Sequence, residues 1–143
     1  MIHSKDFNFS FSGLKTAVLY LLRDLAKEGG DIKRLYPLIA REFQQAVIDV
    51  LIAKTLRAAK TYKAKSIILG GGVAANKQLR LQLGKAINCQ LSTINYQLSP
   101  TSLTGDNAAM IAAAGYLRFL NGDVLRTKKE LLNIHADATL RFG

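Results

Sequence analysis

The feature that most constrains the fold of this chain is a short apolar run that ends in three consecutive glycines. Residues 66–69 read Ser-Ile-Ile-Leu and are followed directly by Gly70, Gly71 and Gly72. A continuous apolar run bounded by glycines is typical of a strand buried on both faces of a sheet. Helical spacing then begins and extends over about residues 73–86. We therefore expect a strand, a tight turn and a helix, the repeating unit of α/β folds.

The remaining periodicities predict more helix than strand. Phe7, Phe9 and Phe11 alternate with polar residues, which predicts a short strand with one apolar face. A second weak strand is expected over residues 89–94, before a polar loop. Longer helices are expected over about residues 14–27, 37–56 and 106–120.

The segment after Pro37 has one apolar face. Pro37 suits a first helical turn, and Asp31 is expected to cap a short helical piece before it. The expected buried stripe has the three- and four-residue spacing of one helix face and consists of Ile39, Phe43, Ala46, Val50, Ala53 and Leu56. In the later alanine-rich helix, Gly115 would let the backbone lie close against a neighbouring element.

Strands that alternate with helices place the chain in the α/β class, with most residues in helices. Two or three strands are too few for a complete doubly wound sheet, so the pattern indicates a piece of a larger fold. The 143 residues suffice for one core and are too few for two domains of ordinary size.

Composition narrows the function classes. Twenty Lys and Arg against ten Asp and Glu give a formal charge of +10, which attracts polyanions such as RNA; because the bases are scattered, a solvated basic surface is the alternative. The lack of a long apolar stretch and of a signal peptide predicts a soluble cytoplasmic protein with no membrane span. Cys89, the single cysteine, is interpreted as an ordinary strand residue without a disulfide partner.

The glycine turn is the strongest local candidate for a binding site. Glycines at Gly70, Gly71 and Gly72 let a ligand approach the main chain, and a following helix N-terminus offers N–H groups and partial positive charge to a phosphate. Asn76 adds an amide that could contact a ribose or base. The motif matches neither the dinucleotide fingerprint nor the P-loop. A purely structural turn, with Asn76 a polar residue on an early helical turn, is an equal alternative.

Asp106 opens the alanine-rich helix and has two interpretations. In the first it caps the helix, because a carboxylate there accepts backbone N–H bonds. In the second it is a metal ligand. His3 and His135 are the only histidines and show no paired spacing, so any complete metal site needs ligands from elsewhere.

Three blocks, taken together, resemble the tRNA threonylcarbamoyladenosine transferase family (TsaD type, formerly described as O-sialoglycoprotein endopeptidase-like, Gcp). They occur in the order and spacing of that family and read Phe-Ser-Phe-Ser-Gly-Leu-Lys-Thr-Ala from Phe9, Gly-Gly-Gly-Val-Ala-Ala-Asn from Gly70, and Gly-Asp-Asn-Ala-Ala-Met-Ile-Ala from Gly105. The resemblance covers about residues 6–120. It implies an actin-like ATPase (ASKHA) fold of two lobes. Residues 1–143 would be the C-terminal lobe, without the N-terminal lobe and its His-x-x-x-His metal motif.

The resemblance also implies the chemistry. Asn76 would lie in the site for threonylcarbamoyl-AMP, with the three glycines near its nucleotide part. Asp106 would bind one divalent metal, iron or zinc, together with two histidines of the other half. The family transfers the threonylcarbamoyl group to the exocyclic amine of an anticodon-loop adenine in tRNA, an acyltransferase reaction. The block from Phe9 receives no specific role. Thr104-Gly105 replaces the Cys-Thr of many members, which leaves the ligand itself in place.

The expected partners are tRNA and the N-terminal half or other subunits of the same modification complex. We expect the chain alone to be incomplete and inactive, and self-association is one response to an exposed lobe interface. The alternative function is a non-catalytic ASKHA-type interaction subunit, against which the retained Asp106 argues. The former protease description finds no His-Glu-x-x-His here.

Overall fold

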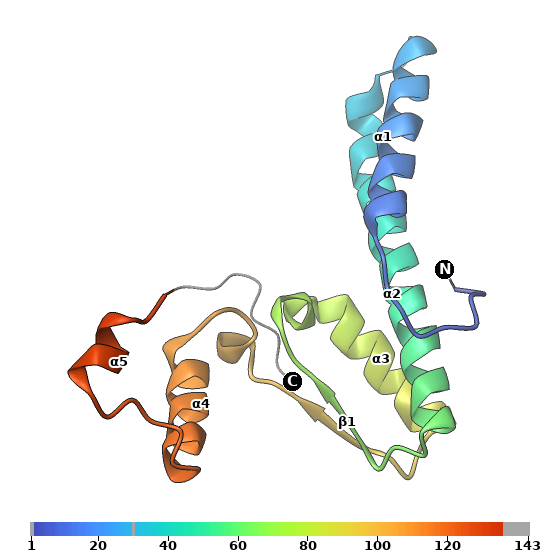
Figure 1. The fold of residues 1–143 in the computed structure, drawn as a ribbon. Coiled ribbons are helices and arrows are strands. Elements are labelled where there is room, and N and C mark those ends of the chain that lie inside the picture. The colour runs from blue at the N-terminus through green and yellow to red at the C-terminus, as the bar shows by residue number, and fades with distance from the viewer. Residues whose placement is uncertain (1, 30, 136–143) are drawn as a thin grey trace. The chain divides into compact units, whose positions relative to one another are not determined.

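The computed structural model of the chain describes residues 2–29 and 31–135 (Figure 1). The chain divides into two compact units, Met1–Gly105 and Asp106–Gly143, which are described one at a time. No helix in the described ranges is long and apolar enough to cross a membrane.

The first unit is a helix-rich α/β arrangement with a small parallel sheet. Its elements are α1 (Ser12–Lys27), the 3-10 helix η1 (Ile32–Leu35), α2 (Tyr36–Thr61), β1 (Ser66–Leu69), the 3-10 helix η2 (Gly72–Ala75), α3 (Lys77–Gln90), β2 (Asn95–Leu98) and the 3-10 helix η3 (Thr101–Leu103). β1 and β2 pair in parallel, with Ser66 opposite Asn95 and Leu69 opposite Leu98. The expected helices at both ends of the 3-10 helix η1 are confirmed, and Pro37 lies in the first turn of α2.

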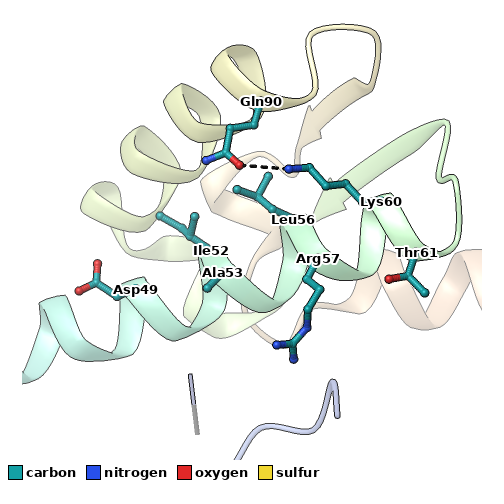
Figure 2. Close-up of a pocket in the computed structure, with 8 residues that line it drawn as sticks. All are labelled: Asp49, Ile52, Ala53, Leu56, Arg57, Lys60, Thr61 and Gln90. Carbon is teal, nitrogen blue, oxygen red and sulfur yellow. Dashed lines mark hydrogen bonds between the residues drawn. The ribbon is translucent and has the colours of Figure 1, made fainter. Parts of the chain in front are cut away.

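The core lies where α2 and α3 pack on one face of this sheet. Its buried members are Ile48, Leu56, Leu79, Leu83 and Ile87, with Ile67, Leu69 and Tyr96 packed against them. Figure 2 shows a pocket beside these two helices, where Lys60 Nζ donates to Gln90 Oε1 at 3.4 Å. Of the stripe expected on α2, only Leu56 is buried; the other buried residues of this helix are Ile48, Lys54 and Ala59.

The prediction that residues 66–69 are buried on both faces is wrong for the described residues. Ile67 and Leu69 face the core, whereas Ile68, on the opposite face, is 70% exposed. Alternate strand residues point to opposite faces, and only one face of this sheet is covered by α2 and α3. One side of an apolar strand is therefore open.

The predicted second strand over residues 89–94 is also wrong. α3 continues to Gln90, and β2 begins only at Asn95. The cause is the four-residue spacing of Leu83, Ile87 and Leu91, which keeps one helical face on the core. Cys89 is consequently an exposed helix residue rather than a strand residue.

The alternating phenylalanines do not form a strand, since the described structure has no strand over residues 7–11. Their backbone is held by side chains of α2 instead. Lys54, 1% exposed, donates from Nζ to Ser4 Oγ (2.8 Å), Asp6 Oδ1 (3.0 Å) and the Asn8 carbonyl oxygen (2.6 Å). Arg57 donates to the Asp6 carbonyl oxygen. The three N–H groups of the buried Lys54 thus provide hydrogen bonds that a neighbouring strand would otherwise supply to this segment.

The Lys54–Asp6 pair makes stability depend on acid. Hydrogen bonding to Lys54 is the main cause that lowers the Asp6 pKa from 3.8 to about 2. A lowered folded-state pKa gives stability that is complete above the unfolded pKa and lost as the pH falls from about 4 to 2. We expect Lys54→Met to flatten this part of the curve of unfolding free energy against pH, measured by urea titration. Lys60→Met, an exposed lysine on the same helix, should keep the wild-type acid dependence; equal flattening in both variants contradicts the assignment.

The second unit contains α4 (Ala108–Leu120) and α5 (Lys128–Leu132). No residue of α4 is buried, and a Cβ on Gly115 would meet open space, so the expected close approach is not found among the described residues. Arg118 Nε pairs with Asp123 Oδ2 at 2.6 Å just after the helix.

Candidate nucleotide-binding site

The glycine turn connects β1 to the 3-10 helix η2. Gly71 has φ +82°, a conformation that residues with a Cβ rarely adopt. A Cβ on Gly70 would lie 3.1 Å from Ser99 Oγ, in the loop after β2. That loop is held against the strand end by the Ser99 N–H, which donates to the Leu69 carbonyl oxygen at 3.0 Å. The structure of the turn therefore explains why Gly70 and Gly71 are glycines.

Gly72 differs, because a Cβ there would meet open space and its φ is not positive. The hydrogen bonds of the turn run from Ala74 N to the Gly71 oxygen (2.9 Å) and from Asn76 N to the Val73 oxygen (3.0 Å). Among the described residues, none of the backbone hydrogen bonds of the turn uses the N–H groups of Gly72 and Val73. Adjacent free N–H groups on an exposed glycine turn are suited to an anionic oxygen.

The expectation that the α-helix opens at Val73 is wrong by one short turn. Residues 72–75 are 3-10, and α3 begins after Asn76, which is its N-cap. Asn76 Oδ1 accepts from the N–H groups of Gln78 (2.9 Å) and Leu79 (3.1 Å). The cause is local: an asparagine oxygen at this position satisfies two helix donors that would otherwise be unpaired.

The other end of the Asn76 side chain is anchored to α2. Asn76 Nδ2 donates to Gln44 Oε1 at 3.0 Å, so one amide N–H remains for another partner. The structural role of Asn76 is therefore shown, and it leaves limited capacity for a ligand in this arrangement. Gln44 was not identified from the sequence, where it is one polar residue of an amphipathic helix.

We expect Asn76→Ala to lower the free energy of unfolding by about 1 kcal/mol, because loss of an N-cap oxygen has this typical effect. Asn76→Ser keeps a capping oxygen and loses only the contact with Gln44, so it should be milder. Urea unfolding of the two variants measures both effects. Equal stability of Asn76→Ala and the parent chain contradicts the capping role.

Arg80 fixes the two walls of the turn and was missed in the sequence. Its Nε donates to the Ala74 carbonyl oxygen, and its Nη2 donates to the Ser99 carbonyl oxygen at 2.7 Å. Ala74 itself is fully buried. One guanidinium therefore joins η2 to the loop after β2. The sequence feature that could have identified Arg80 is a basic residue in the first turn of a helix, where acidic residues are favoured.

Asp106 lies in the second unit, whereas the glycines and Asn76 lie together in the first. The capping interpretation of Asp106 is wrong: Asn107 is the N-cap of α4, and its Oδ1 accepts from the Met110 N–H at 3.0 Å. Asp106 is exposed, and within residues 2–29 and 31–135 no hydrogen bond or ion pair engages its carboxylate. The same ranges contain no group of three His, Cys, Asp or Glu able to hold a metal.

Thr104 lies two residues before Asp106, where the resemblance leads us to expect a cysteine. It is 5% exposed, and its hydroxyl donates to the Thr101 carbonyl oxygen at 2.8 Å. A buried hydroxyl that has a partner is tolerated, so the departure is accommodated locally.

Comparison with known proteins gives these residues a context. The model of the TsaD family, described as tRNA N6-adenosine threonylcarbamoyltransferase, matches residues 1–113 and so includes the turn, Asn76 and Asp106. The chain belongs to this family. Proteins named tRNA N6-adenosine threonylcarbamoyltransferase are similar to it in Listeria welshimeri (46% identical, 85% of this chain, 35% of the relative), Limosilactobacillus fermentum (46%, 82%, 34%) and Bacillus subtilis (47%, 82%, 33%).

The chain thus spans about a third of the length of the threonylcarbamoyltransferases that it matches. The matched stretch contains both the glycine turn and Asp106. Family membership also fits a sheet of two strands with one open face, because a threonylcarbamoyltransferase of full length has further chain to place.

Proposed function

We propose that this chain is the C-terminal lobe of a tRNA N6-adenosine threonylcarbamoyltransferase with an actin-like ATPase (ASKHA) fold. The observation that carries the proposal is the family match over residues 1–113, combined with coverage of only about 35% of the relatives. The exposed face of β1, with Ile68 70% exposed, supports a lobe that is completed by further chain.

In this proposal the glycine turn binds the nucleotide part of threonylcarbamoyl-AMP. Gly72 supports this proposal. The fold has room for a side chain at this position, whereas a ligand lying close to the backbone would leave no room for one. The N–H groups of Gly72 and Val73 are placed to donate to phosphate oxygens. Asn76 would contribute its remaining amide N–H from the start of α3.

Asp106 would supply one ligand of a divalent metal, iron or zinc. Its carboxylate is exposed and has no hydrogen bond or ion pair to the residues that the structure describes, which fits a ligand role; the rest of the ligand set would come from the upstream part of the enzyme. When bound, such a metal acts as a Lewis acid on the carbamoyl group. In the reaction, the adenine exocyclic amine forms a bond to the carbamoyl carbon, the bond from that carbon to the phosphate oxygen breaks so that AMP leaves, and the proton lost by the amine passes to solvent water.

The test is reconstitution from two chains. The upstream two thirds of the Bacillus subtilis relative is produced separately and mixed with this chain, iron or zinc, threonylcarbamoyl-AMP and unmodified tRNA. We expect threonylcarbamoyladenosine in the tRNA from the mixture and none from either chain alone, by mass spectrometry of nucleosides. If the intact relative is active and the mixture forms a complex without activity, the proposal is wrong and a non-catalytic subunit is favoured.

A further inference from the structure

Positive charge is concentrated in one part of the chain. No Asp or Glu occurs between Asp49 and Asp106, whereas this stretch contains eight of the twenty Lys and Arg. The other twelve bases are accompanied by all ten acids, so this stretch carries eight of the ten net positive charges. It contains the second half of α2 and the whole of β1, α3 and β2. Residues 50–105, which form most of the sheet and its covering helices, therefore carry only positive charges.

Bases outside this stretch have acids close to them in the sequence, and in the described ranges three of them pair with one: Lys27 with Asp24 (3.1 Å), Arg34 with Asp31 (3.1 Å) and Arg118 with Asp123 (2.6 Å). Inside it, Lys54 is the one base with an ion pair in the described ranges. The exposed bases that have no ion pair in this part of the structure are Lys60, Lys63, Lys65, Lys77 and Lys85. Uncompensated charge on a folded surface is the electrostatic footprint of a polyanion partner.

Three cations of the stretch surround one hollow. The outer face of α3 and the adjacent face of β2 form a groove of about 490 Å³, lined by Lys77, Arg80, Leu81, Gly84, Lys85, Asn88, Tyr96 and Leu98. Gly84 shapes it, because a Cβ there would lie 3.4 Å from Tyr96 Cε1. Lys77 and Lys85 are eight residues apart, or about 12 Å along the helix axis. The groove is thus long enough for more than one charged group.

Helix electrostatics does not explain these lysines. Lys77 is in the first turn of α3, which contains no acid, so it adds positive charge where the helix dipole is already positive. Lys60, by contrast, lies in the last turn of α2, where a base stabilises the dipole. The pocket beside Lys60 is also lined by Asp49 (Figure 2), and the Arg57 guanidinium in it already donates a hydrogen bond to the N-terminal segment. The groove on α3 is therefore the better anion surface.

We propose that the groove between α3 and β2 binds the phosphate backbone of RNA through Lys77 and Lys85. The inference rests on the proposed function, for which the RNA is the tRNA substrate. Its end at Lys77 directly follows Asn76, so RNA along α3 would lead to the glycine turn. Arg80 adds positive charge to the groove, although its N–H groups donate to the carbonyl oxygens of Ala74 and Ser99. Lysine contacts to phosphate position an RNA without reading its sequence.

The experiment measures binding of the chain to unmodified tRNA by fluorescence anisotropy at several salt concentrations, without metal or intermediate. For Lys77→Gln/Lys85→Gln we expect affinity about tenfold lower and a salt slope smaller by about 2, one for each lost phosphate contact. The control, Lys128→Gln/Lys129→Gln, removes the same charge from α5 and should change both values little. Circular dichroism confirms that both variants are folded.

Three outcomes would contradict the proposal that RNA binds in this groove. Equal losses in both double variants mean attraction by net charge alone, an unchanged groove variant means that RNA binds elsewhere, and polyglutamate of similar length that competes as well as RNA means a general anion surface. Because the assay contains no reaction components, these results are independent of the reconstitution. Activity with an unchanged groove variant supports the proposed function and rejects only the groove.

Discussion

In the reconstituted two-chain enzyme, Asp106→Ala is expected to abolish both metal retention and threonylcarbamoyl transfer. A metal ligand contributes directly to the charge stabilisation of the transition state, and several kcal/mol of such stabilisation correspond to a rate loss of about 10³-fold or more. The measurements are metal content after gel filtration and the single-turnover rate. Asp123→Ala is the matched control, since Asp123 is an exposed acid of the same unit whose partner is Arg118.

The fold should not be affected by this change. The Asp106 carboxylate has no hydrogen bond or ion pair within the described ranges, and surface substitutions of this kind usually alter stability by less than about 0.5 kcal/mol. Unfolding of the isolated chain separates the two roles. Normal metal content and rate in Asp106→Ala would show that this aspartate is not a ligand, whereas a large loss of stability would indicate a structural role.

Ile87→Ala should destabilise the chain by about 2–5 kcal/mol, the usual range for deletion of a large aliphatic side chain from a core. Ile87 is 1% exposed and belongs to the cluster between α2, α3 and the sheet. Domains have only about 5–15 kcal/mol of net stability, so this single change removes a large part of it. The measurement is the midpoint and slope of urea unfolding, followed by circular dichroism.

Ile111→Ala provides the matched comparison, because the same atoms are deleted from a side chain that is 75% exposed on α4. Its effect should be within about 0.5 kcal/mol. If both variants lose similar stability, the core does not lie where the structure places it. A loss confined to Ile87→Ala confirms that the α2–α3 contact organises the first unit.

Local patterns in the sequence were sufficient for α1, α2, α4 and β1. Apolar spacing predicted α1, α2 and α4, and the apolar run with its glycines predicted the strand and turn. These signals act within a few residues, so they can be read directly. The three motif blocks likewise predicted the family, which the match over residues 1–113 confirms.

The errors lie where distant contacts decide the outcome. Phe7 and Phe9 have the alternation of a strand, but Lys54 binds the backbone beside them across 46 residues of sequence. The start of α3 depends on the Asn76 side chain, and Asn107 rather than Asp106 caps α4. Competing caps of similar chemistry are distinguished by backbone geometry, which spacing does not contain.

The sequence by itself thus determined the class of the fold, the turn and its family, because each depends on residue type and short spacing. Only the tertiary structure decided that Arg80 joins the two walls of the turn, that Gln44 anchors Asn76, and that Lys77 and Lys85 line one groove with β2. The physical reason is that hydrogen bonds and Coulomb interactions depend on distance in space. Segments far apart in sequence come within that distance only after α2, α3 and the sheet have packed.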